Sequence, residues 1–167
     1  GEQGVRGHGI ALNEASLHVP LLIRIPGLKP TDYKQYVSLV DIAPTILDMA
    51  GLGDKVPASW VGTSLAPMLA LGKDLDHPPL HVETWRNKVQ KKKRILYQSG
   101  LIYDGRKVTV QFDDMKLGFY DKIPRRPKDE KQVYPELDIS GLRNDQLYMI
   151  KYLLDWNKKL VEPRCRN

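Results

Sequence analysis

Apolar positions in the first half of the chain follow two patterns. A nearly continuous apolar run from His18 to Ile25 is typical of a strand that is covered on both faces. Apolar residues at helical spacing predict an amphipathic helix over Ser38–Ala50. Pro44 is tolerated only in the first turn of a helix, so we expect the helix to begin at Val40 or Asp41.

Local signals set the ends of these elements. Gly51 is a good stop for the predicted helix, and Ser38 with Asp41 resembles a capping start. Short helices are expected over Ala11–Leu17 and Ser64–Leu71. These elements, alternating with an apolar run, indicate an α/β first half.

From Leu80 the pattern changes to short apolar runs separated by turn residues, which is typical of β structure. Asp104-Gly105 is a strong two-residue hairpin signal, and a helix is predicted over Asn144–Leu160. The expected strands are Leu80–Thr84, Arg94–Gln98, Gly100–Tyr103, Lys107–Phe112 and Leu117–Tyr120, and the expected apolar stripe of the helix is Leu147, Ile150, Leu153, Leu154 and Val161. Pro78-Pro79 separates this half, a small antiparallel sheet with one packed helix, from the first.

The composition is that of a globular protein. The chain has 167 residues, of which 41% are hydrophobic and 28% charged, and it fits one ordinary domain or one and a half small ones. No apolar run approaches the roughly 18 residues of a membrane helix, so no membrane span is expected. The single cysteine, Cys165, cannot form an internal disulfide or a cysteine-rich metal site.

The net charge of +6 is unevenly distributed. Basic residues cluster at Lys88, Lys91, Lys92, Lys93 and Arg94, and again at Arg125, Arg126 and Lys128. Such clusters attract phosphate or sulfate polymers, although a solvated loop or strand edge has the same composition. Because aromatic residues do not alternate with the basic ones, no nucleic-acid partner is expected.

The glycine-rich N-terminal loop holds the candidate chemistry. His8 lies between two glycines, on a backbone that can approach a ligand closely, and its imidazole can donate to an anionic oxygen or protonate a leaving group. Glu2, Arg6 and Glu14 are candidates for metal or anion binding. Glu14 also fits the exposed side of a short helix, or a buried hydrogen bond to the loop.

Other histidines and other enzyme motifs add little. His18 either flanks a site or caps a strand, and His77 and His81 bracket a Pro-Pro pair rather than forming a helical metal pair. The sequence contains no Gly-x-Ser-x-Gly elbow, no phosphate-binding loop ending in Lys-Ser/Thr, and no Cys-x-x-Cys.

Two long motifs resemble the sulfatase family, which belongs to the alkaline phosphatase superfamily. The first comprises Gly1-Glu2, Gly7-His8-Gly9, Leu12, Glu14 and Val19–Gly27, with Asn13 where tyrosine is usual, and the second comprises Val37–Gly51 followed by Gly62–Leu65, Pro67 and Leu69. The resemblance covers about Gly1–Leu71. It implies that residues 1–79 are the C-terminal part of an alkaline-phosphatase-like α/β/α sandwich, and that residues 80–167 are a subdomain with a small antiparallel sheet and a C-terminal helix.

The resemblance also implies a chemistry. Sulfatases hydrolyse sulfate esters with a formylglycine, made from a Cys or Ser in Cys/Ser-x-Pro-x-Arg, beside a Ca²⁺ ion. Neither that motif nor a metal ligand is expected in this chain, since the Asp-His ligand pair would lie immediately before Gly1. His8 would be the catalytic and substrate-binding residue, hydrogen-bonding a sulfate oxygen or the leaving oxygen, and Glu2 would support the metal ligands.

The expected partners follow from the same resemblance. They are a sulfate-ester substrate, with sulfated glycans among the open classes, and the N-terminal remainder of the same protein, without which this chain would be inactive. The family indicates an extracytoplasmic location. Two alternatives remain: a phosphodiesterase or phosphonate monoester hydrolase of the same superfamily, and a non-catalytic module that binds anionic glycans through the basic clusters.

Overall fold

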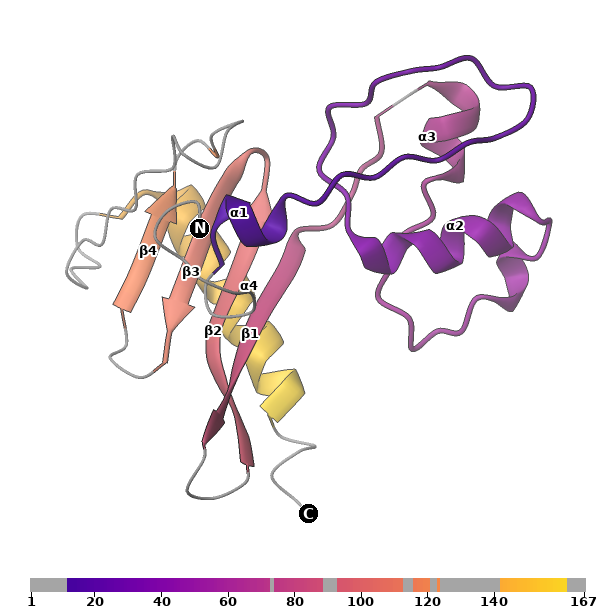
Figure 1. Cartoon of the computed structure of the whole chain (residues 1–167). Coiled ribbons are helices and arrows are strands. Elements are labelled where there is room, and N and C mark those ends of the chain that lie inside the picture. The colour runs from indigo at the N-terminus through magenta and orange to yellow at the C-terminus, as the bar shows by residue number, and fades with distance from the viewer. Residues whose placement is uncertain are drawn as a thin grey trace. The chain divides into compact units, whose positions relative to one another are not determined.

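The computed structural model describes residues 12–72, 74–88, 93–112, 116–120, 123 and 142–161. In chain order the elements are α1 (Glu14–Leu17), η2 (Leu39–Asp41), α2 (Ile42–Met49), η3 (Gly53–Lys55), α3 (Ala66–Leu71), β1 (Leu80–Lys88), β2 (Lys93–Tyr103), β3 (Arg106–Gln111), β4 (Lys116–Tyr120) and α4 (Asn144–Val161) (Figure 1). They form two compact units. One unit is Leu21–Leu80, and the other combines the residues before Leu21 with those from His81 onward.

The unit that contains the residues from His81 onward is built on a four-stranded sheet in the order β1-β2-β3-β4. The β2–β3 and β3–β4 pairs are antiparallel. Asp104 and Gly105 join β2 to β3 with φ angles of 48° and 71°, the left-handed pair that a two-residue hairpin turn requires. The predicted hairpin is therefore confirmed. The two strands expected between Arg94 and Tyr103 are one strand, because Ser99 pairs with Val110 without interrupting the ladder.

Helix α4 packs against one face of this sheet and buries the core. The core side chains are Leu101, Val108, Val110, Leu117, Met149 and Leu153. The predicted stripe of the helix is partly wrong, since Leu147 and Leu154 are 41% and 43% exposed. The buried positions are Met149, Leu153 and Asn157, which repeat every four residues and place a polar side chain on the inward face.

The opposite face of the sheet is covered by the residues that follow the N-terminal loop. A Cβ at Gly100 would lie 3.2 Å from Leu12 Cδ1 and 3.1 Å from both Val82 Cγ2 and the Val108 carbonyl oxygen, so Leu12 packs closely on the backbone of β2 at this glycine. Helix α1 begins at Glu14 rather than Ala11, and Asn13 caps it by accepting a hydrogen bond of 3.1 Å from the Ser16 N–H. The sheet therefore lies between α4 and the Leu12–Leu17 segment (Figure 1).

The other unit, Leu21–Leu80, is formed around α2. This helix begins at Ile42, so Pro44 lies in the first turn, and it ends before Gly51, whose φ is +73°. The Ser38 N–H donates to the Asp41 carboxylate at 2.6 Å, half of a capping box. The predicted stop is confirmed, whereas α2 starts one residue after the predicted Asp41, because Leu39–Asp41 form the 3-10 turn η2 instead. Helix α3 lies within the helix expected at Ser64–Leu71.

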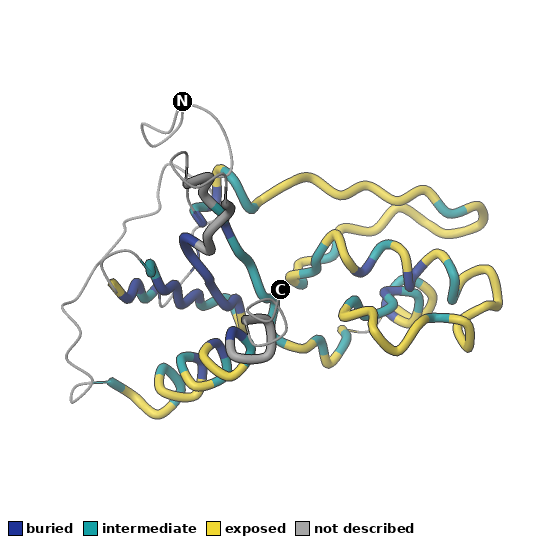
Figure 2. Tube along the Cα trace, turned by 90° about the horizontal axis from the view of Figure 1, so that it is seen from below, coloured by how far each residue is buried: buried dark blue, intermediate teal, exposed yellow. Residues whose placement is uncertain are grey.

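The strand predicted over His18–Ile25 does not form. Figure 2 shows an exposed stretch after α1, in which Val19 is 49% and Leu22 is 91% exposed. A strand needs a neighbour for its backbone hydrogen bonds, and none of the described residues pairs with this run. Its apolar pattern is real, but no layer of the described residues covers it.

The assignment of residues 1–79 to a catalytic domain stays a prediction. The described residues before Leu21 belong with the sheet, whereas the break near residue 80 coincides with the second boundary between the units. None of the described helices is both long and apolar enough to cross a membrane.

Candidate functional site

The structure describes the flank of the predicted site. Glu2, Arg6 and His8 lie outside the described residues, and so does Cys165. The basic clusters also fall there, except that Lys88, Lys93 and Arg94 belong to strands whose side chains are not described at those positions. The segment Leu12–Leu17, which follows the polar loop directly, is described in full.

Lys107 on β3 holds this segment through a buried ammonium group. Its Nζ donates to the Leu12 carbonyl at 2.9 Å and to Glu14 Oε1 at 3.2 Å. The side chains of Lys107 and Glu14 are only 0% and 6% exposed. The ammonium also lies 4.4 Å from the centre of the Tyr120 ring, within range of a cation–π contact.

Glu14 is therefore the counter-ion of a buried lysine. A buried ammonium is tolerated only when it is paired and hydrogen-bonded, and Glu14 supplies the matching charge. The alternative of an exposed helical position is wrong, and the alternative of a buried polar contact is the observed one. The sequence offered little indication that Lys107 would be its partner. The one sign was a lysine at a position of the strand that is buried.

Gln98 on β2 binds the other side of the Leu12 backbone. The Leu12 N–H donates to Gln98 Oε1 at 3.2 Å, and Gln98 Nε2 donates to Gln111 Oε1 at 2.9 Å. Both backbone polar groups of Leu12 are thus satisfied by side chains of the sheet. Leu12, the residue that follows the polar loop, consequently has a fixed position on β2 and β3.

A second polar cluster lies on the α4 face of the sheet. The Ser99 hydroxyl donates to Asn157 Oδ1 at 3.2 Å, and His81 Nε2 contacts Ser99 Oγ at 2.8 Å. The His81 ring also lies 4.9 Å from the Trp156 ring, between centres. Burial lowers the pKa of His81 from 6.5 to about 4, so the ring is neutral near pH 7.

This serine–histidine pair resembles a catalytic nucleophile and its general base, but a substrate could not reach it. Ser99 is 0% exposed beneath α4, so no substrate reaches its hydroxyl. Its hydroxyl instead links His81 of β1 to Asn157 of α4 between the sheet and the helix. A serine inside an apolar strand and an asparagine on the inward side of a helix are the sequence signals for such a cluster.

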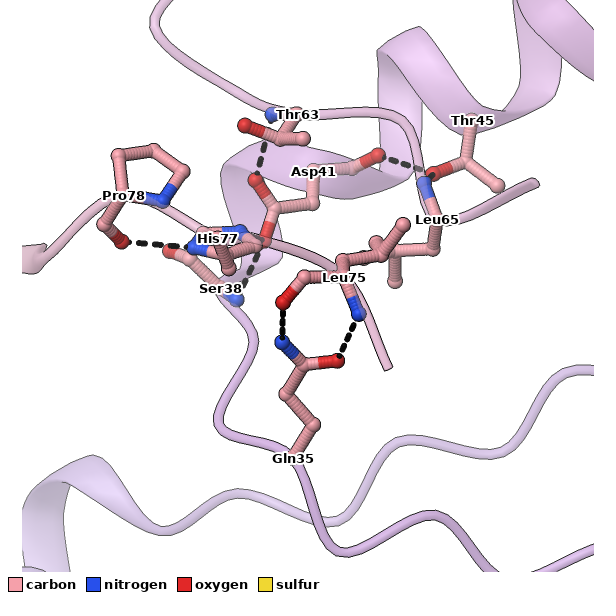
Figure 3. A network of polar contacts seen from close by, with 9 residues as sticks. All are labelled: Gln35, Ser38, Asp41, Thr45, Thr63, Leu65, Leu75, His77 and Pro78. Atoms are coloured by element: carbon pink, nitrogen blue, oxygen red, sulfur yellow. Dashed lines mark hydrogen bonds and ion pairs between the residues drawn. The ribbon is translucent and has the colours of Figure 1, made fainter. Parts of the chain in front are cut away.

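The Leu21–Leu80 unit contains a third polar network, centred on Asp41 (Figure 3). Asp41 is 1% exposed. Its carboxylate accepts from the Ser38 N–H at 2.6 Å and the Thr63 N–H at 2.8 Å, and it contacts His77 Nε2 at 3.0 Å. His77 Nδ1 lies 2.8 Å from the Pro78 carbonyl oxygen, so both ring nitrogens face acceptors.

Neighbouring side chains extend this network. Thr45 Oγ1 donates to the Asp41 carbonyl at 2.5 Å and accepts from the Leu65 N–H at 2.8 Å. The Gln35 amide pairs with both backbone groups of Leu75, at 2.5 and 2.9 Å. The network therefore joins three segments that are distant in sequence, and the Asp41 carboxylate is fully used in holding them.

The described residues do not fit a calcium site. No group of three or more His, Cys, Asp or Glu side chains gathers in the described part of the chain. The ligand pair expected before Gly1 and the formylglycine beside it therefore stay predictions.

Comparison with known proteins identifies the family. The sequence profile described as "N-sulphoglucosamine sulphohydrolase, C-terminal" matches residues 1–104, more than half of the chain. The chain belongs to this sulfatase family. The sulfatase resemblance of the two N-terminal motifs is thereby confirmed.

Individual relatives agree with this assignment. Arylsulfatase K of Homo sapiens is 47% identical over 60 residues, which cover 35% of this chain and 11% of that protein. N-acetylglucosamine-6-sulfatase of Homo sapiens is 40% identical over 79 residues, covering 47% of this chain and 13% of the relative. The match thus spans only about a tenth of the length of these curated relatives.

A solved structure is also similar. It comes from a protein described with the metabolism of multiple glycosaminoglycans by Bacteroides thetaiotaomicron, and it aligns with a TM-score of 0.48 at 20% identity. The alignment covers 84% of this chain and 27% of that one.

Proposed function

We propose that this chain is the C-terminal part of a sulfatase that hydrolyses sulfate esters. The observation that carries the proposal is the family match over residues 1–104, joined by relatives at 47% and 40% identity that are both named as sulfatases. Because the match spans only 11% and 13% of those relatives, the remainder of the catalytic domain would be supplied by a longer protein.

In that longer protein, residues 1–79 would complete an α/β/α sandwich. The exposed apolar run supports this, because Val19, Leu22 and Ile23 carry the pattern of a doubly covered strand but lack a covering layer among the described residues. Pairing with strands of the remainder would satisfy its backbone and bury these side chains.

The proposed chemistry divides between the longer protein and this chain. A formylglycine beside Ca²⁺, both outside the described residues, would supply the nucleophile and the charge stabilisation. His8 would donate a hydrogen bond to a sulfate oxygen or to the leaving oxygen, and Glu2 would orient the metal ligands. The anchoring of Leu12 to the sheet supports this assignment, since it fixes the end of the loop that carries both residues.

A sulfated glycan is the substrate class that we propose. The name of one relative, N-acetylglucosamine-6-sulfatase, specifies a sulfated sugar. The net charge of +6, concentrated in two basic clusters, also favours an anionic polymer as the ligand.

Substitution of His8 in the longer protein tests the proposal. His8→Ala removes the hydrogen-bond donor to the sulfate, so turnover of an aryl sulfate should fall about 100-fold or more. Lys151→Ala is the control, because Lys151 is exposed on α4, on the face of the sheet opposite the Leu12–Leu17 segment. It should leave turnover within about twofold. Full activity of the His8→Ala variant toward sulfate esters would contradict the assigned role.

A further inference from the structure

We propose that Lys107 is a positioning residue for the polar loop that ends at Leu12, and through that loop for His8. The proposal rests on the proposed function, since it concerns how that site is held in place. It adds a residue of the C-terminal sheet to a site whose other predicted members all lie at the N-terminus.

The contacts of Lys107 are those of an anchor. An ammonium group has three N–H donors, and here one is directed at the Leu12 carbonyl and one at Glu14 Oε1. The Tyr120 ring faces the same ammonium. With Gln98 accepting from the Leu12 N–H, the peptide groups on both sides of Leu12 are immobilised on the sheet.

The anchored residue, Leu12, lies close to His8 along the chain. Leu12 follows His8 by four residues, so the two Cα atoms are at most ~14 Å apart. A rigid anchor next to a binding loop leaves that loop fewer conformations, so less conformational entropy is lost when substrate binds.

The use of a charge at this position favours positioning over stability. An apolar residue in a buried face is generally as stabilising as a buried ion pair, because both charges of the pair must be desolvated. An apolar side chain would fill the space beside Glu14, but it would not hold the Leu12 carbonyl. A buried lysine specifies one registration of the segment on the sheet, and this property is useful to a catalytic loop.

Arg106 provides a matched control on the same strand. It precedes Lys107 and contacts the other side of the sheet, where its guanidinium pairs with Asp145 of α4 at 2.6 Å. Arg106→Met removes a half-exposed ion pair from the same strand without touching the Leu12–Leu17 segment.

The experiment uses the longer protein with four variants: Lys107→Met, His8→Ala, the double variant, and Arg106→Met. We expect Lys107→Met to lower kcat for an aryl sulfate about 100-fold with little change in KM, and Arg106→Met to leave both nearly unchanged. If Lys107 acts through His8, the double variant is no slower than His8→Ala alone. Effects that multiply in the double variant, or full activity of Lys107→Met, would overturn the proposal.

Amide hydrogen exchange supplies a readout that does not depend on activity. Peptides covering residues 12–17 should exchange faster in Lys107→Met than in Arg106→Met or the parent protein. Where Lys107→Met fails to fold because Glu14 remains unpaired, Lys107→Met with Glu14→Gln removes both charges and should show the same faster exchange. If residues 12–17 exchange at the same rate in Lys107→Met as in the parent protein, the anchoring proposal is overturned. If His8→Ala keeps full sulfatase activity, the proposed function is overturned instead.

Discussion

Buried polar side chains in this chain join segments that are far apart in sequence. Lys107 binds Leu12, which precedes it by 95 residues in the sequence, and Asp41 binds His77, which follows it by 36 residues. Each contact satisfies a group whose burial alone would cost several kcal/mol. At the scale of single residues, these contacts decide where the loops of the molecule are held.

Such contacts are the hardest feature to predict from the sequence. Asp41 is recognisable as a helix-start residue because its partner Ser38 is a near neighbour along the chain. Its contacts with Thr63 and His77 depend on the fold, and so does the pairing of Glu14 with Lys107. Spacing along the chain carries no information about partners of this kind.

His81 makes the stability of the sheet unit dependent on pH. Its pKa is lowered to about 4 in the folded chain by burial, whereas the unfolded chain takes up a proton near the ordinary value of 6.5. The stabilisation is therefore complete above about pH 6.5 and is lost as the pH falls toward 4. His81→Gln, which does not titrate, should remove this part of the dependence.

Urea unfolding between pH 7 and pH 4 measures this effect. A Trp60→Phe background leaves Trp85 and Trp156 to report on the sheet unit by fluorescence. Asp145 does not interfere, because the hydrogen bond from Arg143 holds its pKa below the ordinary 3.8, so its own loss of stabilisation lies below this window. The prediction would be contradicted if the free energy of unfolding depended on pH equally in the His81→Gln variant and in the protein that retains His81.

At the scale of elements, the sequence predicted correctly those turns and helix ends that are stabilised by residues close together along the chain. The Asp104-Gly105 turn needs only its own left-handed residues. The continuous helical segment of η2 and α2 needs the Ser38–Asp41 contact at its start, the first-turn Pro44 and the C-terminal Gly51. The inward face of α4 is rotated from the expected one, because Asn157 is buried against Ser99. The prediction of a strand over His18–Ile25 failed because pairing requires a neighbour that periodicity cannot supply.

Gly62 allows two segments of the Leu21–Leu80 unit to approach closely. A Cβ at this position would lie 2.1 Å from the Val40 carbonyl oxygen, which is far inside contact distance and belongs to backbone that cannot rotate away. Gly62→Ala should therefore separate the segments and destabilise the unit by about 2 kcal/mol. Thermal unfolding followed by circular dichroism measures the loss.

Gly53→Ala is the control for this change. The atom nearest its Cβ would be Asp48 Oδ1 at 2.9 Å, and a side-chain end can adjust where a backbone carbonyl cannot. The melting temperature should decrease by several degrees more for Gly62→Ala than for Gly53→Ala. Equal melting temperatures for the two variants would show that η2 yields to the added methyl group.

At the scale of the whole molecule, the chain belongs to the C-terminal region of a sulfatase family, and its matches span only a small part of the relatives' length. The family could be recognised from residues 1–71, because both motifs there are long and occur in the expected order. The sheet and α4 were predicted as a small antiparallel unit, and that prediction is confirmed. Substrate selectivity had no comparable signal, since it depends on loops brought together only by the complete fold.

The central claim is that the longer protein cleaves sulfate esters, and two substrates with one leaving group test it directly. The measurement is kcat/KM of the longer protein for 4-nitrophenyl sulfate and for bis(4-nitrophenyl) phosphate. A site built for sulfate should prefer the sulfate ester by about 100-fold or more, because it is matched to the charge and shape of that transition state. Preference for the phosphate diester would contradict the claim and favour a phosphodiesterase of the same superfamily.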